Sequence, residues 1–312
     1  SDRSLYATPL FPYDSWTSTQ PGTKGIHMLV RQELNKLGFV CALLCLGLPQ
    51  AQAQSIDGLL SNVSDTIGDL TDVVAPGVTN IRIGLGPVFT PAYEGSDDYE
   101  IKAAPLISFR YLDLVQVDNN QIRVNVFGSD SLFRSEHFKA GPILKLDFGR
   151  DETDSPDLLG LGDVGTSLEL GVFASYTAGP ARARIRAQQD VLSGHSGMRI
   201  VGDLGVAVYR SDRLAVTGNL SATWTDSSYM SAFFSVTAAQ AVTSGLTAFT
   251  ATSGLKDISL AFGANYKVTE SWAVVANAGY SKLLGDAKNS PIVSVQGSSS
   301  QFVGGVFAVY SF

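Results

Sequence analysis

Three arginines at alternate positions are the most informative polar residues of the chain. Arg182, Arg184 and Arg186 are followed at the same spacing by Gln188 and Asp190. Residues two apart share one face of a β-strand, so all five side chains point the same way. An arginine facing lipid near the bilayer midplane costs about 2–4 kcal/mol. If this segment crosses a membrane, its arginine face must therefore line an interior.

Acidic residues on the neighbouring predicted strands supply partners for these arginines. Glu169 lies on the polar face of the preceding strand and Asp203 on that of the following strand. Two interpretations stay open. The five residues form a neutralised network that rigidifies the interior, or they form a narrow constriction that favours anions.

A search for catalytic chemistry finds little. Beyond residue 53 the chain has two histidines, His137 and His195. His195 lies in a Ser- and Gly-rich predicted outer loop, where a flexible turn is the simpler explanation, because nucleophilic catalysis needs a base held beside a hydroxyl. There is no G-x-S-x-G motif, and the acidic predicted loops 92–98 and 150–162 lack EF-hand spacing. We expect no catalytic, cofactor-binding or metal-binding residues and a non-enzymatic function.

The composition narrows the class of protein. Of the 312 residues, 45% are hydrophobic but only 16% are charged, against about 25% charged in a typical soluble domain. The net charge of −7 argues against a nucleic-acid-binding protein. No apolar run reaches the roughly 18 residues of a membrane-spanning helix.

The N-terminal part has the features of an export signal. Residues 28–53 contain basic residues, an apolar run from Leu37 to Leu48 and a small-x-small cleavage site that ends at Ala53. This three-part order predicts a signal peptide. Residues 1–27 are then an upstream extension from an over-long gene assignment. The mature chain lacks cysteine, because Cys41 and Cys45 both lie in the signal peptide.

Residues 54–78 form a different segment, which we expect in the periplasm. Apolar residues recur there at spacings of three and four, which predicts an amphipathic helix. The segment could cap a barrel, contact a partner or act as a leader. The apolar positions are Ile56, Leu59, Leu60, Val63, Ile67, Leu70 and Val74.

From residue 79 the hydrophobic period becomes two. In 256–268, Ile258, Leu260 and Phe262 alternate with polar or small residues. Most of the predicted strands have roughly 10–14 residues, longer than the 5–6 usual in soluble proteins, and long enough to cross a membrane as tilted strands. We predict about twelve: 80–91, 99–111, 112–118, 121–127, 137–149, 163–177, 180–192, 199–211, 213–225, 256–268, 271–283 and 301–312.

Aromatic residues frame the apolar faces of these strands. Trp272 and Tyr280 bracket one strand, and Phe138 and Phe148 another. Such pairs stand roughly 20–25 Å apart along the membrane normal, as the two aromatic girdles of an outer-membrane barrel do. Short turns alternate with long loops. We therefore predict an all-β, transmembrane, antiparallel up-and-down barrel over 79–312, with a soluble β-sandwich as the alternative.

The longest predicted outer loop has an unusual composition. Residues 227–255 include no charged residue and several aromatic ones. A fully solvated loop is rarely so apolar. We expect this loop to fold over or into the barrel mouth or to extend two strands, and this argues against a wide open pore.

Several segments resemble the MipA/OmpV family of Gram-negative outer-membrane proteins. They begin near residue 79 and continue to the C-terminus. The most specific run is Leu283–Pro291, and Ala104-Pro105 and Gly254–Asp257 belong to the same resemblance. The residues that carry it are Gly84, Gly86, Pro87, Tyr93, Gly95, Ser96, Gly285, Asp286, Ser290 and Pro291.

The resemblance implies a location and a set of partners. It implies a barrel in the outer membrane, surrounded by lipid and lipopolysaccharide, that acts as a scaffold between a lytic transglycosylase and a murein synthase. The C-terminal Tyr310 and Phe312 resemble the signal read by the barrel-assembly machinery. The alternative function is a narrow channel or small-solute binder with an arginine-lined lumen.

Overall fold

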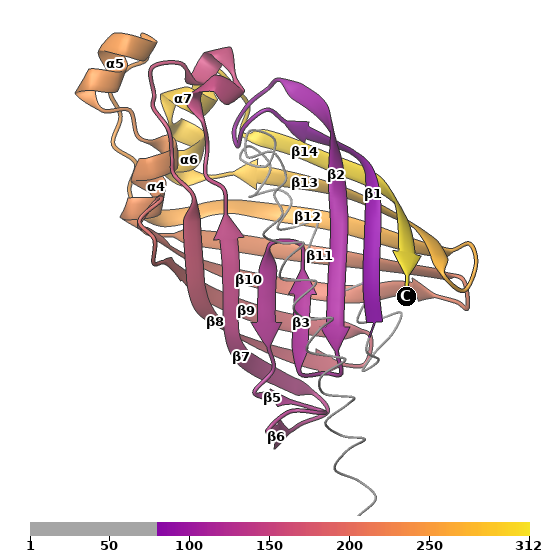
Figure 1. Cartoon of the computed structure of the whole chain (residues 1–312). Helices are drawn as coiled ribbons and strands as arrows, with labels where there is room; N and C mark the ends of the chain where they lie inside the picture. The colour runs from indigo at the N-terminus through magenta and orange to yellow at the C-terminus, as the bar shows by residue number, and fades with distance from the viewer. Residues whose placement is uncertain (1–79) are drawn as a thin grey trace, which may run out of the picture. The chain divides into compact units, whose positions relative to one another are not determined.

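The computed structural model describes residues 80–312, which form a sheet of long antiparallel strands with short helices at one end (Figure 1). The upstream extension (1–27), signal peptide (28–53) and amphipathic segment (54–78) expected from the sequence lie outside the described residues. The strands are β1 (Asn80–Pro91), β2 (Tyr99–Tyr111), β3 (Val115–Asp118), β4 (Gln121–Val124), β5 (Phe127–Gly128), β6 (Phe133–Arg134), β7 (Phe138–Asp147), β8 (Ser167–Ala178), β9 (Ala181–Asp190), β10 (Met198–Arg210), β11 (Leu214–Thr225), β12 (Gly254–Lys267), β13 (Trp272–Leu283) and β14 (Ser300–Ser311).

The sheet closes on itself. From β7 to β14 each strand pairs with the next, and β14 pairs with β1, β1 with β2, β2 with β3, β3 with β4 and β4 with β7. Over residues 80–312 this gives a closed barrel of twelve antiparallel strands, with β5 and β6 as short additions at its edge. The predicted fold class and strand number are confirmed.

The barrel is apolar outside and polar inside. On β12, Ile258, Leu260 and Phe262 are 41–49% exposed, whereas Asp257 and Ser259, which alternate with them, are about 4% exposed. A soluble protein shows the opposite arrangement. The outward face can therefore be solvated by lipid, and the inward face carries the polar groups.

Aromatic contacts mark both margins of the apolar band. At one end Tyr310 contacts Trp272 (ring centroids 5.2 Å apart) and Phe312 (4.9 Å). At the other end Tyr280 contacts Phe302 (5.0 Å), and Phe89 stacks on Tyr99 at 4.7 Å. These are the two girdles predicted from the framing pairs. Within residues 80–312, no helix is long and apolar enough to cross a membrane.

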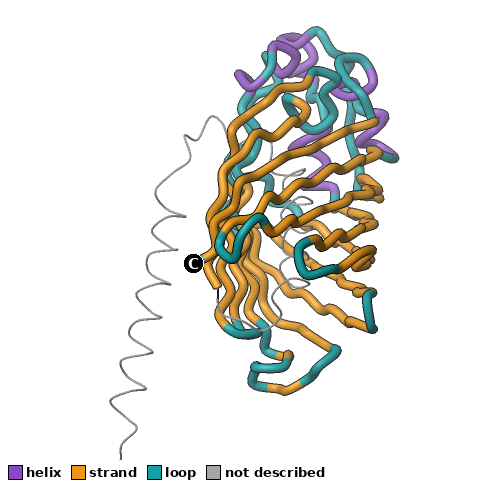
Figure 2. Tube along the Cα trace, turned by 90° about the vertical axis from the view of Figure 1, so that its right-hand side faces the viewer, coloured by secondary structure: helices purple, strands orange, loops and turns teal. Residues whose placement is uncertain are grey.

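The two ends of the barrel differ in their connections. Tight turns such as those between β8 and β9 and between β10 and β11 occupy one end, which is the periplasmic end by the usual asymmetry of these barrels. Helices gather at the other, outer end (Figure 2). They are η1 (Glu152–Asp154), η2 (Pro156–Leu158), α4 (Ser227–Phe234), α5 (Ala238–Ser244), α6 (Gly285–Asn289) and α7 (Pro291–Ser294).

The β3–β4 hairpin is shorter than its neighbours. It pairs with β2 only over Ser108–Tyr111, and Asn119 at its tip bonds the N–H and C=O of Ile107. Above that point the outer edge of β2 has no strand partner among the described residues. Pro105 lies on this edge. Because proline has no backbone N–H, the edge has one fewer unpaired hydrogen-bond donor. The predicted strands 112–118 and 121–127 were too long.

Candidate functional site

The three arginines of β9 share the Asp203 carboxylate inside the barrel. Asp203 on β10 is the register partner of Arg184, whose Nε donates a hydrogen bond to it at 3.0 Å. The Arg182 and Arg186 guanidinium groups stand 3.7 and 3.6 Å from the same carboxylate. The Arg184 and Asp203 side chains are at most 1% exposed. Three positive charges thus surround one negative charge, a cluster that we call the arginine ladder.

Glu169 belongs to a second cluster next to the ladder. Its carboxylate lies 2.7 Å from the Arg199 guanidinium and 3.3 Å from Nε2 of His195, and it accepts a hydrogen bond from Gln188 at 3.3 Å. The guanidinium at 2.7 Å belongs to Arg199 of β10 and not to an arginine of the ladder. Arg199 and Asp203 are four residues apart on β10, so both side chains point inward. This could have been inferred from the sequence.

His195 is a packed residue rather than part of a flexible turn. It is 4% exposed, and its ring contacts Tyr229 and Phe233 of α4 at centroid distances of 4.9 and 5.9 Å. Nδ1 accepts the N–H of Gly197 at 3.0 Å. The histidine therefore links the β9–β10 loop, the Glu169 cluster and the helix above them.

The uncharged loop folds over the outer mouth, as expected. Tyr229, Phe233 and Phe234 are buried in one apolar cluster with Leu283 and Val293. Polar bonds fix the helices to other loops: Arg150 donates to the Phe233 carbonyl at 2.9 Å, and the Ser290 hydroxyl donates to the Phe234 carbonyl at 2.7 Å. Burial lowers the pKa of Arg150 to about 10. We call this assembly of loops the outer cap.

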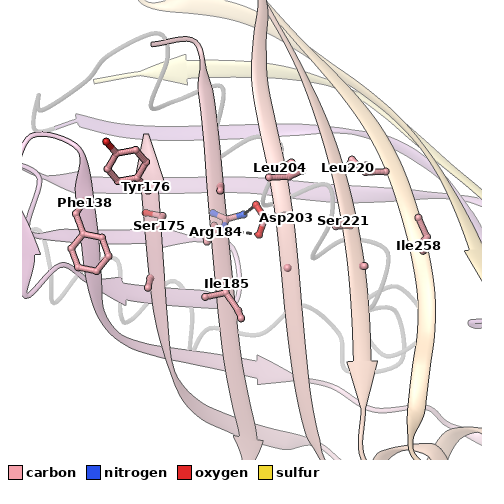
Figure 3. Close-up of a pocket in the computed structure, with 14 residues that line it drawn as sticks. Phe138, Ser175, Tyr176, Arg184, Ile185, Asp203, Leu204, Leu220, Ser221 and Ile258 are labelled. Atoms are coloured by element: carbon pink, nitrogen blue, oxygen red, sulfur yellow. Dashed lines mark hydrogen bonds and ion pairs between the residues drawn. The ribbon is translucent and has the colours of Figure 1, made fainter. Parts of the chain in front are cut away.

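An apolar hollow lies on the lipid-facing side of the barrel wall, over the ladder. It has a volume of about 560 Å³, and its lining includes small outward residues such as Ala183 and Gly202 and larger ones such as Leu204 and Tyr176. Figure 3 shows Arg184 and Asp203 bonded to each other on the strands that bear this hollow. We expect lipid acyl chains to fill it, because it faces the bilayer and has almost no polar surface.

A family model described as MltA-interacting protein MipA matches residues 83–312. The chain belongs to the MipA family. Together with the barrel, this makes it an outer-membrane protein. No curated protein matches the chain.

Solved structures similar to this MipA-family chain are also barrels. The KdgM porin shares 11% identity, covering 74% of this chain and 99% of that chain, with a TM-score of 0.40. The NanC porin shares 12% identity over 75% and 99% of the two chains, with a TM-score of 0.39. The translocator domain of the autotransporter NalP from Neisseria meningitidis shares 10% identity over 85% and 100%, also with a TM-score of 0.39.

Most residues that carry the family resemblance lie in the outer cap. The Tyr93 hydroxyl donates to the Gln296 carbonyl at 3.0 Å, and burial raises its pKa. Gly95 has φ +104° and donates its N–H to the Gln301 side chain. Ser96 bridges to Gly297. The same region contains Gly285 at φ +50°, Asp286 bonded to Thr252, and Ser290 and Pro291 at the start of α7.

The remaining motif residues lie at the seam between β1 and β14. A Cβ on Gly86 would stand 1.9 Å from the Val306 carbonyl oxygen, and one on Gly84 2.8 Å from a methyl of Val309. Pro87 has no backbone N–H and therefore donates no hydrogen bond between β1 and β14. The C-terminal Phe312 donates its N–H to the Ile81 carbonyl, while its side chain is 74% exposed. These residues therefore serve barrel closure.

Proposed function

We propose that this protein is a scaffold, held in the outer membrane, for enzymes that synthesise and hydrolyse murein. The observation that carries the proposal is the match of residues 83–312 to a family described as MltA-interacting protein. The partners that we propose are a lytic transglycosylase and a murein synthase. We infer that the protein acts without catalysis of its own, after export by its signal peptide.

The surface that we assign to the partner is the periplasmic tongue, residues 125–137, which includes β5 and β6. Leu132 is 82% exposed and Phe133 57% exposed, and Phe133 stacks on Phe127 at 4.9 Å. Exposed apolar groups at the aqueous end of a barrel favour a protein contact.

The tongue is also held in one shape. The Asp113 carboxylate accepts the N–H of Ser129 at 3.0 Å and its hydroxyl at 2.9 Å, and it pairs with Lys139. Asn125 donates to the Asp113 carbonyl. A fixed surface loses less conformational entropy on binding than a mobile one.

Affinity capture from detergent-solubilised envelopes tests the scaffold. The tagged full chain should retain a lytic transglycosylase or a murein synthase. The double variant Leu132→Ser and Phe133→Ser should retain at least tenfold less of that enzyme than the unmodified chain. Val268→Ser is the matched control, since Val268 is 51% exposed in another periplasmic turn. Failure to recover any murein enzyme would reject the scaffold, and undiminished recovery by the double variant would reject the tongue.

The arginine ladder favours a second candidate function, a narrow channel or binding site for anions. Three guanidinium groups lie around one carboxylate on the inward face of β9 and β10, and guanidinium groups bind anions. Single-channel recording tests this candidate. No conductance, or a conductance that Arg184→Ala leaves unchanged, would remove it.

We further propose that Tyr310 and Phe312 are read by the barrel-assembly machinery, and that lipopolysaccharide surrounds the outer half of the barrel. The exposed Phe312 ring, which contacts Tyr310, supports the first of these.

A further inference from the structure

We propose that a basic pocket at the periplasmic mouth of the barrel binds the free carboxylates of murein peptides. The pocket has a volume of about 330 Å³ and lies between the β10–β11 turn and the end of β12. Three of its lining residues are cations, Arg210, Arg213 and Lys267, and one is an acid, Asp212. We call it the turn pocket. The identity of its ligand rests on the proposed scaffold, because enzymes that act on murein must be held beside murein.

Two of these cations stand directly opposite each other. The register of β11 and β12 pairs Leu214 with Tyr266, and one step further the Arg213 carbonyl accepts the N–H of Lys267 at 2.8 Å. Like charges at directly opposed positions of a sheet destabilise it. An anion bound between the two side chains would remove their repulsion.

The chain itself neutralises the turn pocket only in part. Lys267 lies 3.9 Å from Glu270, whose side chain is 98% exposed, and an exposed pair of this kind contributes little to stability. Arg210 and Arg213 form no ion pair with any other residue of 80–312. Asp212 supplies one carboxylate against three cations. The pocket therefore has an excess of positive charge that suits an anionic ligand.

The floor of the turn pocket adds a hydrogen-bond donor. Asn265 is 3% exposed, and its side-chain oxygen accepts a hydrogen bond from Arg82 at 2.7 Å. This leaves the amide NH2 group of Asn265 to donate. Guanidinium and amide N–H groups match the two oxygens of a carboxylate. A volume near the lower end of the roughly 300–1,000 Å³ of ligand pockets suits one acidic group with its nearest neighbours.

The turn that carries the arginines is held in one shape. The N–H of Ser211 donates to the Leu214 carbonyl at 2.8 Å, and the Ser211 hydroxyl accepts the N–H of Leu214 at 3.1 Å. Arg210 pairs with Ala215 in the same hairpin. Because this backbone is already fixed, ligand binding costs less conformational entropy than it would on a mobile loop.

The position of the turn pocket favours murein over lipid as the source of the anion. Ala215 and Asn265, which line it, are 3–4% exposed and point into the barrel. Tyr209 on β10 and Tyr266 on β12 point outward and are 53% and 46% exposed. Aromatic residues of this kind mark the level of the lipid headgroups, so a headgroup phosphate would approach the other side of the wall. Murein peptides reach the pocket from the periplasm.

Co-sedimentation with purified murein sacculi tests the turn pocket, with the full chain held in detergent micelles. The full chain should sediment with the sacculi, and Arg213→Glu should raise the amount of sacculi needed for half-sedimentation at least tenfold. Arg210→Glu is a second variant and should act in the same direction. Arg134→Glu is the matched control, because it reverses the charge of another exposed arginine at the periplasmic end. Sacculi whose carboxylates have been converted to amides should bind at least tenfold more weakly.

Three results would overturn the proposal: no sedimentation of the full chain, undiminished sedimentation of Arg213→Glu and Arg210→Glu with normal heat-modifiable mobility, or an equal loss with Arg134→Glu. Phosphatidylglycerol added to the micelles should leave murein binding unchanged, and displacement of murein would assign the pocket to a lipid headgroup instead.

The affinity capture described above separates this proposal from the scaffold. If the full chain captures a murein enzyme but does not bind sacculi, the turn pocket is rejected and the scaffold stands. If the full chain binds sacculi through Arg213 but captures no enzyme, the scaffold is rejected and the turn pocket stands.

Discussion

Asp203→Asn is the most decisive single substitution in the barrel. It keeps the shape of the side chain but removes the negative charge that all three arginines of the ladder contact. Arg184 stands 2.9 Å from the Asp203 carboxylate, Arg186 3.6 Å and Arg182 3.7 Å. All three positive charges are held by strands and remain inside the barrel after the change.

The size of the effect follows from these distances. At an effective dielectric constant of 20, each contact contributes about 5 kcal/mol of Coulomb attraction, or about 15 kcal/mol in total. Water entry and side-chain movement offset most of this. Breaking one buried pair costs about 3–5 kcal/mol in measured cases. We therefore expect Asp203→Asn to lower the free energy of unfolding by at least about 3 kcal/mol.

Urea unfolding of the barrel in lipid vesicles, followed by tryptophan fluorescence, measures the loss. Asp212→Asn is the control, because it removes a charge from an exposed periplasmic turn. Adding Arg186→Gln to Asp203→Asn should restore part of the stability by removing one repelling charge. If Asp203→Asn and Asp212→Asn differ by less than about 0.5 kcal/mol, the ladder is not neutralised by Asp203 and the electrostatic argument is wrong.

Three further predictions concern the seam, the cap and the C-terminus. Gly86→Ala should abolish the heat-modifiable folded band on electrophoresis, because its Cβ would stand 1.9 Å from a carbonyl oxygen, whereas outward Gly202→Ala, with nothing within 4 Å, should fold normally. His195→Ala should raise the rate of proteolysis within 226–253 about tenfold, because the ring contacts of α4 are lost; an unchanged rate would mean that the histidine does not hold the cap. Phe312→Ala should slow barrel assembly severalfold in a pulse-chase measurement while leaving the stability of the folded barrel within about 1 kcal/mol, since the ring is exposed; assembly at the normal rate would reject its role as a signal.

The strands were predictable because a membrane barrel repeats one simple rule along each of them. Residues such as Ile258 and Leu260 alternate with Asp257 and Ser259, and this alternation alone identified β12 within two residues of its ends. The framing aromatic residues Trp272 and Tyr280 likewise predicted the two groups of aromatic contacts at the ends of the strands. The parity that places Asp203 and the three arginines inward was available in the same way.

Two features of the site could not be predicted from the sequence. One is the position of each side chain along the barrel axis, and the other is contact with segments distant in the sequence. The alternation of polar and apolar residues shows which face of the sheet a residue lies on, but not its position along the barrel axis. Glu169 was therefore grouped with the ladder, although it pairs with Arg199. His195 was taken for a flexible turn because the aromatic rings that cover it come from α4, more than thirty residues later. Turns with positive φ at Leu112 and Asn119 bound β3. Asparagine favours that conformation, but leucine does not, so the turn before β3 could not be predicted from residue type.

The short hairpin gives the barrel an uneven hydrophobic height. Beside β3 and β4 the wall ends at the polar tip Asn119-Asn120, below the level of Tyr99 in the outer girdle. Lipids on that side meet a wall that is too low for their acyl chains, and they must thin or tilt to match it. The bilayer should therefore be deformed on one side of this protein only. That gives the molecule a preferred tilt and a preferred side for approach by other membrane proteins, set by hydrophobic mismatch rather than by any specific contact.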